Sequence, residues 1–197
     1  MNIILSNELL DKFELKNQDF LVDKNYYDLK SGQQEYRLYS YLSTLFNNIT
    51  ILDIGTLNGR SAISLSHNEN NKVISYDIMD CIKNLDHKIY TKSNIEFRIK
   101  NVLDDLNKEF IKNIKIIMID IDHFYIIEKM IIDKLKELDY DGIILLDDII
   151  HPSQKEFEAM QKLWNEIQDE KYNITKYGHW SGTGLINLNK NIKIILE

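Results

Sequence analysis

The chain has little of three residue types that constrain a fold: its 197 residues include one cysteine, one proline and seven glycines. The single cysteine, Cys81, excludes an internal disulfide and is typical of a reducing compartment. No apolar run approaches the ~20 residues of a membrane-spanning helix, and Ile3-Ile4-Leu5 is too short for the hydrophobic part of a signal peptide. We therefore expect a cytoplasmic protein without a membrane partner.

Positive charge is also scarce compared with negative charge. The sequence has 24 lysines and arginines against 31 aspartates and glutamates, a net charge of −7, and the two signs are interspersed. A nucleic-acid-binding protein normally presents a basic face, so we expect no nucleic-acid partner. The hydrophobic content of 44% is typical of a folded globule, and the length predicts one domain over residues 1–197.

Apolar patterns with the period of a strand alternate with patterns that have the period of a helix, which predicts an α/β fold. Strands are expected at 50–54, 73–77, 95–99, 114–120, 142–147, 172–177 and 184–188. Helices are expected at 33–46, after Gly59, at 103–111, at 125–138 and from Pro152 to about 169, with a weak helix or loop at 79–88. Residues 1–32 are expected to form a helical or lid segment before a core at 33–188, and the last two strands an antiparallel closing pair.

The first of these strands leads into a glycine turn with the pattern Asp53-x-Gly55-x-x-x-Gly59. Both glycines fall where the chain must turn sharply near a bound ligand, and Thr56 and Ser61 lie in the same turn. The pattern differs from the dinucleotide fingerprint G-x-G-x-x-G, and no Walker lysine follows. We expect a nucleotide-type cofactor here, with a turn that binds no ligand as the alternative.

Four predicted strands end in an aspartate, and in an open parallel sheet such ends form the ligand crevice. These residues are Asp53, Asp77, Asp120 and Asp147. Asp77 lies where a doubly wound fold places the acid that accepts hydrogen bonds from ribose hydroxyls, with Ile78 beside it; capping the next segment is the alternative role.

Asp120, Asp147 and Asp148 follow neighbouring predicted strands, so their carboxylates should converge. Such oxygen ligands suit Mg²⁺ or Mn²⁺. His123 would stand beside the ion as a general base, and Asp122 would orient it, be a metal ligand itself or contact the substrate. The alternative is that these acids only cap helices.

Between the last two predicted strands, His179 and Trp180 lie in a stretch with three glycines. Aromatic faces and short hydroxyl residues are typical of a sugar pocket, so both residues are candidates for substrate binding. The alternative is a hairpin in which Trp180 fills the core.

The glycine turn resembles the first motif of class I S-adenosylmethionine-dependent methyltransferases. Together with Asp120-x-x-His123 and the Asp147-Asp148 pair, it resembles the metal-dependent sugar (macrocin-type) O-methyltransferases, which are related to the catechol-type group. The resemblance implies a Rossmann-like, mostly parallel seven-stranded sheet with an antiparallel closing strand and helices on both faces.

The resemblance also implies S-adenosylmethionine and Mg²⁺ or Mn²⁺ as cofactors. Asp120, Asp147 and Asp148 would be the metal ligands, His123 the base, and Asn101 and Val102 contacts to adenine, with Asp104 either another adenine contact or a cap. The acceptor would be a small molecule, a sugar or sugar-nucleotide. One departure is the absence of glycine in the turn Asp122-His123-Phe124-Tyr125.

Two other functions fit the same pattern less well. An NAD-dependent oxidoreductase would use the same topology, although Leu57 takes the place of the middle glycine. A non-catalytic S-adenosylmethionine-binding protein would have no use for the acidic residues. A homo-oligomer, with Tyr26, Tyr27 and residues 33–36 as a lid or contact, is possible in each case.

Overall fold

The computed structural model describes residues 1–21, 24–81, 87–150 and 155–197. At its centre lies a seven-stranded sheet with the order β4-β3-β2-β5-β6-β8-β7. Its strands are β2 (Thr50–Ile54), β3 (Lys72–Asp77), β4 (Ile95–Ile99), β5 (Ile114–Ile119), β6 (Ile143–Asp147), β7 (Lys171–Asn173) and β8 (Thr183–Asn187). Neighbouring strands run parallel except that β8 is antiparallel to both β6 and β7. The expected fold class is confirmed.

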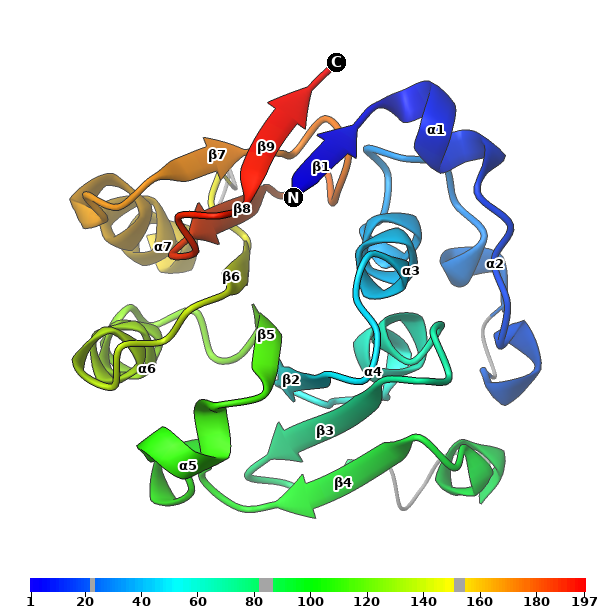
Figure 1. Ribbon diagram of the computed structural model, residues 1–197, viewed down its shortest axis with the longest axis horizontal. Coiled ribbons are helices and arrows are strands. Elements are labelled where there is room, and N and C mark those ends of the chain that lie inside the picture. Colours follow the sequence, from blue (N-terminus) through cyan, green and yellow to red (C-terminus); the bar gives the residue numbers. More distant parts are fainter. Residues whose placement is uncertain (22–23, 82–86, 151–154) are drawn as a thin grey trace.

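Helices cover both faces of this sheet (Figure 1). One face carries α3 (Tyr36–Thr44) and α4 (Arg60–Leu65), and the other carries α5 (Lys108–Ile111), α6 (Ile126–Glu137) and α7 (Lys155–Glu166). Parallel strands buried on both faces account for the nearly continuous apolar runs in the sequence.

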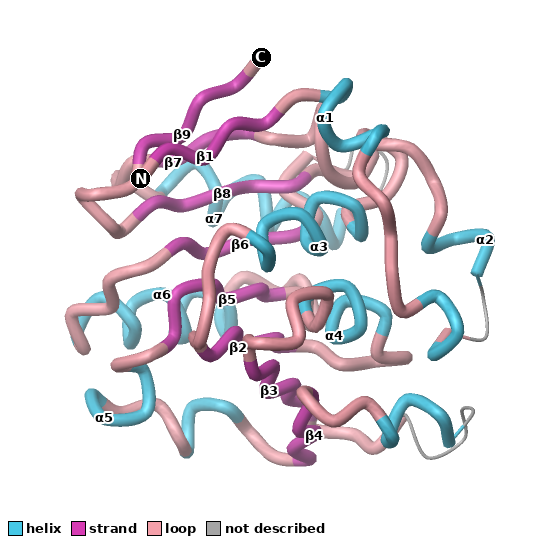
Figure 2. Tube along the Cα trace, turned by 45° about the vertical axis from the view of Figure 1, so that its right-hand side comes forward, coloured by secondary structure: helices cyan, strands magenta, loops and turns pink. Residues whose placement is uncertain are grey.

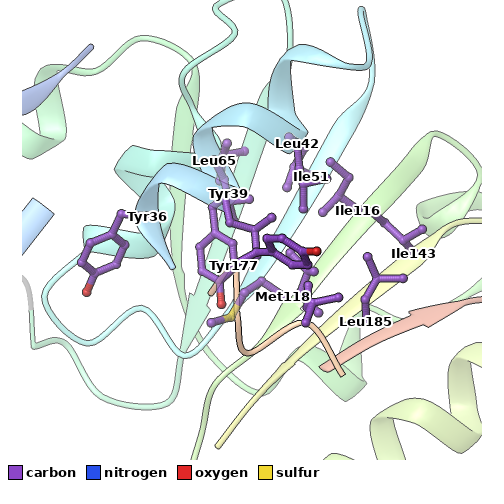
Figure 3. Close-up of a cluster of buried hydrophobic side chains, with 14 of the residues drawn as sticks. Tyr36, Tyr39, Leu42, Ile51, Leu65, Ile116, Met118, Ile143, Tyr177 and Leu185 are labelled. Atoms are coloured by element: carbon purple, nitrogen blue, oxygen red, sulfur yellow. The ribbon is translucent and has the colours of Figure 1, made fainter. Parts of the chain in front are cut away.

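Alternation along the strands divides the buried side chains between two cores. Ile51 of β2 packs toward α3 and α4, whereas its neighbour Leu52 packs toward α6 and α7. Figure 3 shows the first core, where Tyr39, Leu42 and Leu65 from the helices meet side chains of the strands. The same alternation later decides which face receives each aspartate at a strand end.

The helix expected at 103–111 is interrupted. A short 3₁₀ turn (Val102–Asp104) precedes α5, and an asparagine begins each of the two pieces. Asn101 Oδ1 accepts a hydrogen bond from the Leu103 N–H, and Asn107 Oδ1 accepts from the N–H groups of Glu109 and Phe110. Such side-chain caps compete with a continuous helix, so two short turns replace one helix.

The ends of the chain form a second, two-stranded sheet that the sequence pattern did not predict. The first strand, β1 (Asn2–Leu5), pairs in parallel with the last, β9 (Lys193–Leu196), and both termini lie beside it (Figure 2). Ile3 and Leu5 are fully buried in the first core, together with Leu10 of α1 (Asn7–Lys12). Residues 1–32 therefore begin with a core strand; α2 (Lys24–Tyr27) and the 3₁₀ turn Gln18–Phe20 follow.

Two expected elements lie partly outside the described residues. Within 79–88, positions 82–86 are not described, and a 3₁₀ turn (His87–Thr91) follows them. Pro152, expected to open the last helix, also lies outside, and α7 is described from Lys155. In the described ranges, no helix is long and apolar enough to cross a membrane.

Candidate active site

A cavity of about 380 Å³ opens at the carboxyl ends of β2, β3 and β5. This volume falls in the usual range for small-molecule sites. Expected site residues that line it are Gly55, Asp77, Ile78, Asn101, Val102, Asp120, Asp122 and His123. The fold therefore brings together residues that are far apart in the sequence.

The glycine turn forms one wall of this cavity. Gly55 has φ of 104°, and a Cβ there would coincide with the backbone carbonyl of Asp120 on the neighbouring strand. Its N–H donates to the carbonyl of Tyr76 on the other side, at 2.9 Å. Glycine is thus required at position 55 by the close approach of β5 as well as by the turn.

Asp77, at the end of β3, ties two walls of the cavity together. Its Oδ2 accepts a hydrogen bond from the Leu57 N–H at 2.9 Å, and its Oδ1 accepts from the Met79 N–H at 3.0 Å. Each carboxylate oxygen can accept a further bond, so the local capping contact and a bond to a ligand hydroxyl are compatible.

A buried polar network lies beneath the cavity rather than in its wall. Asp53 is the fourth residue of five in β2, inside the strand and not at its end as expected. Ser75 Oγ donates to Asp53 Oδ2 at 2.5 Å and lies 2.6 Å from Thr56 Oγ1. Burial raises the pKa of Asp53 to about 6. Asp53, Thr56, Gly59 and Ser61 are thus not among the residues that line the cavity.

Beyond β4, Asn101 and Val102 reach the cavity side by side. Val102 is buried, and Asn101 directs its side-chain oxygen to the backbone. Asp104 is exposed and does not line the cavity. The position of Asp104 therefore disfavours a contact to adenine, which was one of its two expected roles.

His123 lies between two carboxylates. Its Nε2 is 3.5 Å from Asp120 Oδ1 and 3.3 Å from Asp148 Oδ2. His123 itself adopts a left-handed conformation with φ of 59°, so this turn forms without the glycine that related patterns contain. Desolvation in the crevice, followed by the charges of Asp148 and Asp53, raises the pKa of Asp120 to about 7.

A second group lies at the end of β6 and involves a residue that the sequence analysis treated only as part of a lid. Glu35, Asp147 and His179 each direct a donor atom to a common region, and these atoms lie within 4.8 Å of one another. Burial raises the pKa of Glu35 to about 8, with further contributions from the charges of Asp120 and Asp148. Burial also raises the pKa of Asp147 well above its usual value, with the charges of Asp120 and Glu35 adding to it.

The three aspartates expected to converge are therefore divided between two groups. Asp120 and Asp148 face His123, whereas Asp147 faces Glu35 and His179. Alternation along β6 gives the reason for Asp147: it shares a face with Ile143 and Leu145, which pack toward α3, and Glu35 directly precedes α3.

Two further features differ from expectation. Trp180 is 57% exposed and meets the His179 ring edge-on at 5.2 Å, so it does not fill the core. Glu128 of α6 is buried although charged, and its proximity contributes to the raised pKa of Asp120. An acid in the first turn of an apolar helix is the signal that would have drawn attention to Glu128.

The strand order and the cavity at the carboxyl edge are those of a Rossmann-like fold, and solved structures of methyltransferases share this fold. No family model and no curated protein matches the sequence. An O-methyltransferase from Bacillus cereus, in complex with S-adenosylhomocysteine, has a TM-score of 0.57 and 15% identity, over 92% of this chain and 96% of that one.

Two more structures have the same architecture. A protein from Corynebacterium glutamicum has a TM-score of 0.62 and 12% identity, over 93% of this chain and 94% of that one. The O-methyltransferase TomG from Streptomyces achromogenes, in complex with S-adenosylmethionine, has a TM-score of 0.54 and 14% identity, over 78% and 79%. At these identities the likeness establishes the fold.

Proposed function

We propose that this protein is an S-adenosylmethionine-dependent O-methyltransferase. The observation that carries the proposal is the cavity at the carboxyl edge of the sheet, bounded by the Gly55 turn, Asp77 and His123. Structures with the same fold include O-methyltransferases in complex with S-adenosylmethionine or S-adenosylhomocysteine, which supports the choice of cofactor.

In this cavity Asp77 would accept hydrogen bonds from the ribose hydroxyls. Ile78, Asn101 and Val102 would surround the adenine, since they line the adjoining wall. The cofactor supplies an electrophilic methyl group on a sulfonium. The acceptor oxygen must lie about 3 Å from that methyl carbon and in line with the bond that breaks.

His123 would remove the proton from the acceptor hydroxyl. Its Nε2 faces Asp120 and Asp148, so an imidazolium formed there would have two carboxylates within 3.5 Å. Asp122 lines the same cavity and is exposed, which suits contact with an acceptor.

A divalent cation would assist this reaction. The carboxyl edge of the sheet offers hard oxygen donors for one: the structure divides Asp120 and Asp148 from Asp147, and Asp147 Oδ1 is buried without a hydrogen-bond partner among the described residues. When bound, such an ion lowers the pKa of a coordinated hydroxyl. The acceptor we propose is a hydroxyl of a sugar or sugar-nucleotide, with His179 and the exposed Trp180 at its edge.

The cofactor is tested first by thermal shift and calorimetry. We expect S-adenosylmethionine and S-adenosylhomocysteine to stabilise and bind the protein, and NAD to do neither; stabilisation by NAD alone would favour an oxidoreductase. Methyl transfer is then measured on a panel of sugars and sugar-nucleotides, with Mg²⁺ or Mn²⁺ and with a chelator. Cofactor binding with no transfer to any acceptor, with or without metal, would favour a non-catalytic binding protein.

A further inference from the structure

The group at the end of β6 draws its members from three distant parts of the chain. Glu35 precedes α3, Asp147 ends β6, and His179 lies in the connection between β7 and β8. Their donor atoms lie within 4.8 Å of one another, which is the spacing of ligands around one metal ion. Glu35 and Asp147 are only 4% and 5% exposed.

Two carboxylate oxygens of this group are buried without a hydrogen-bond partner. Glu35 Oε1 accepts a bond from Gln34 Nε2 at 3.3 Å, but Glu35 Oε2 has no donor among the described residues, and neither has Asp147 Oδ1. A buried carboxylate oxygen without a partner is costly. Asp53 Oδ1 and both carboxylate oxygens of Glu128 also lack one among the described residues, but they are not part of this group. Glu35 Oε2 and Asp147 Oδ1 both belong to the group whose donor atoms converge.

The charges of this group also favour a bound cation. Two buried carboxylates at this separation repel each other, and Asp120 and Asp148 add to the repulsion. Either a proton or a cation between Glu35 and Asp147 would relieve it. The imidazole of His179 adds a nitrogen donor: its Nδ1 is 3.8 Å from Asp147 Oδ1 and shares a 2.5 Å hydrogen bond with Ser181 Oγ, a bond that a cation at Nδ1 would replace.

We propose that Glu35, Asp147 and His179 form a divalent-cation site, and that Asp120 and Asp148 instead hold His123. The inference deepens the proposed function by placing the metal on the α3 side of β6. The catalytic role of the ion rests on that proposed function. It adds two ligands, Glu35 and His179, that the sequence pattern did not suggest.

The donor types determine which ion to use as a probe. Two carboxylates and one imidazole suit a transition-metal ion such as Mn²⁺ better than Ca²⁺ or Mg²⁺, which prefer oxygen ligands alone. Three protein ligands also leave positions open for water or a substrate oxygen. Mn²⁺ has the further advantage that its binding is detected by electron paramagnetic resonance.

The test is a Mn²⁺ titration of the full chain, without cofactor or acceptor, followed by electron paramagnetic resonance. We expect one Mn²⁺ per chain, and a loss of affinity of roughly tenfold or more in Glu35→Gln and in His179→Ala. The matched comparison is Asp120→Asn, which removes a neighbouring carboxylate that is not a proposed ligand and, through the loss of its charge alone, should lower the affinity less than Glu35→Gln does. Circular dichroism and urea denaturation check that each variant is folded.

Three results would overturn the inference: no Mn²⁺ bound by the wild-type protein, unchanged affinity in folded Glu35→Gln, or loss of binding in Asp120→Asn with retention in Glu35→Gln. The last result would instead support the ligand set Asp120, Asp147 and Asp148. Because the titration needs no turnover, its outcome is separate from that of the proposed function. Mn²⁺ bound through Glu35 in a protein that binds no S-adenosylhomocysteine would leave the metal site standing and refute the methyltransferase.

Discussion

The two halves of the sheet edge differ in whether their unpartnered acidic oxygens lie together. On the side of β2 and β3, Asp77 accepts hydrogen bonds from two backbone N–H groups and Asp53 accepts one from Ser75, while Asp53 Oδ1 is buried without a partner among the described residues. On the side of β6 and β8, Glu35 and Asp147 each keep a buried oxygen without a partner among the described residues.

This difference separates a preformed pocket from an incomplete one. In the first half, both oxygens of Asp77 are hydrogen-bonded without a ligand and keep acceptor capacity for hydroxyl groups, as a nucleoside requires. The second half keeps buried negative charge together, and this charge is relieved only when a proton or cation joins it. His123, in contact with Asp120 and Asp148, lies at the boundary between the halves.

The largest effect is expected at the contact that joins the two halves. Gly55→Ala would place a methyl group on the Asp120 carbonyl at a φ of 104°, and should cost about 4 kcal/mol or more, enough to prevent folding. The control is Gly59→Ala, where the new methyl group meets only the mobile end of Ile89, at an expected cost of about 1–2 kcal/mol. Urea denaturation compares the two; equal losses would contradict the close approach of β5 as the cause.

His123→Ala should lower turnover by about 10²–10⁴, because it removes the proposed base. The affinity for S-adenosylhomocysteine should hardly change, since the ring faces Asp120 and Asp148 rather than the nucleoside wall. Steady-state kinetics and calorimetry measure the two quantities. Unchanged turnover on an established acceptor would show that another group removes the proton.

The buried carboxyl group of Asp53 should make the stability of the protein depend on pH. Burial raises the pKa of Asp53 in the folded protein to about 6, from 3.8. Between these values the folded state binds more protons than the unfolded state, so this residue lowers stability as pH rises from about 4 to above 6.

Asp53→Asn removes that charge while its amide oxygen still accepts from Ser75. The variant should be more stable than the wild-type protein at pH 8, by up to about 3 kcal/mol, and the difference should shrink toward pH 4. Urea denaturation across this pH range measures it. A difference that stays constant with pH would show that the Asp53 charge is not the cause.

The smallest effect is expected for the nucleoside wall. Asp77→Asn keeps one acceptor oxygen but loses the negative charge, and should weaken S-adenosylhomocysteine binding about tenfold, equivalent to about 1.4 kcal/mol. Asp104→Asn serves as the control because Asp104 is exposed and outside the cavity. Calorimetry of both variants locates the nucleoside. A loss of S-adenosylhomocysteine affinity in Asp104→Asn alone would place the nucleoside beyond β4.

Much of the architecture could be predicted because it depends on local patterns. Every strand of the large sheet was expected near its observed position, since strands buried on both faces leave apolar runs such as residues 114–119. The β1–β9 pair was missed because the paired residues are 191 positions apart and each strand is only four residues long. The division of residues 103–111 was missed because Asn107 was not recognised as a cap.

The candidate site was predicted in part for the same reason. Gly55, Asp77 and His123 stand directly after predicted strands, so the rule that ligands bind at the carboxyl edge places them together. Glu35 carries no such signal: it precedes a helix, and only the packing of α3 against the sheet brings it to Asp147. The alternation of side chains along β6 does indicate that Asp147 faces the side of the sheet that α3 covers.

The sequence by itself determined the order of strands and helices, the glycine turn after β2, and the presence of acids at strand ends, because strand alternation and turn geometry act over a few neighbouring residues. Only the tertiary structure decided which of those acids face each other. Adjacent residues such as Asp147 and Asp148 can point into different environments, and the partners that fill those environments come from segments 25 to 112 positions away.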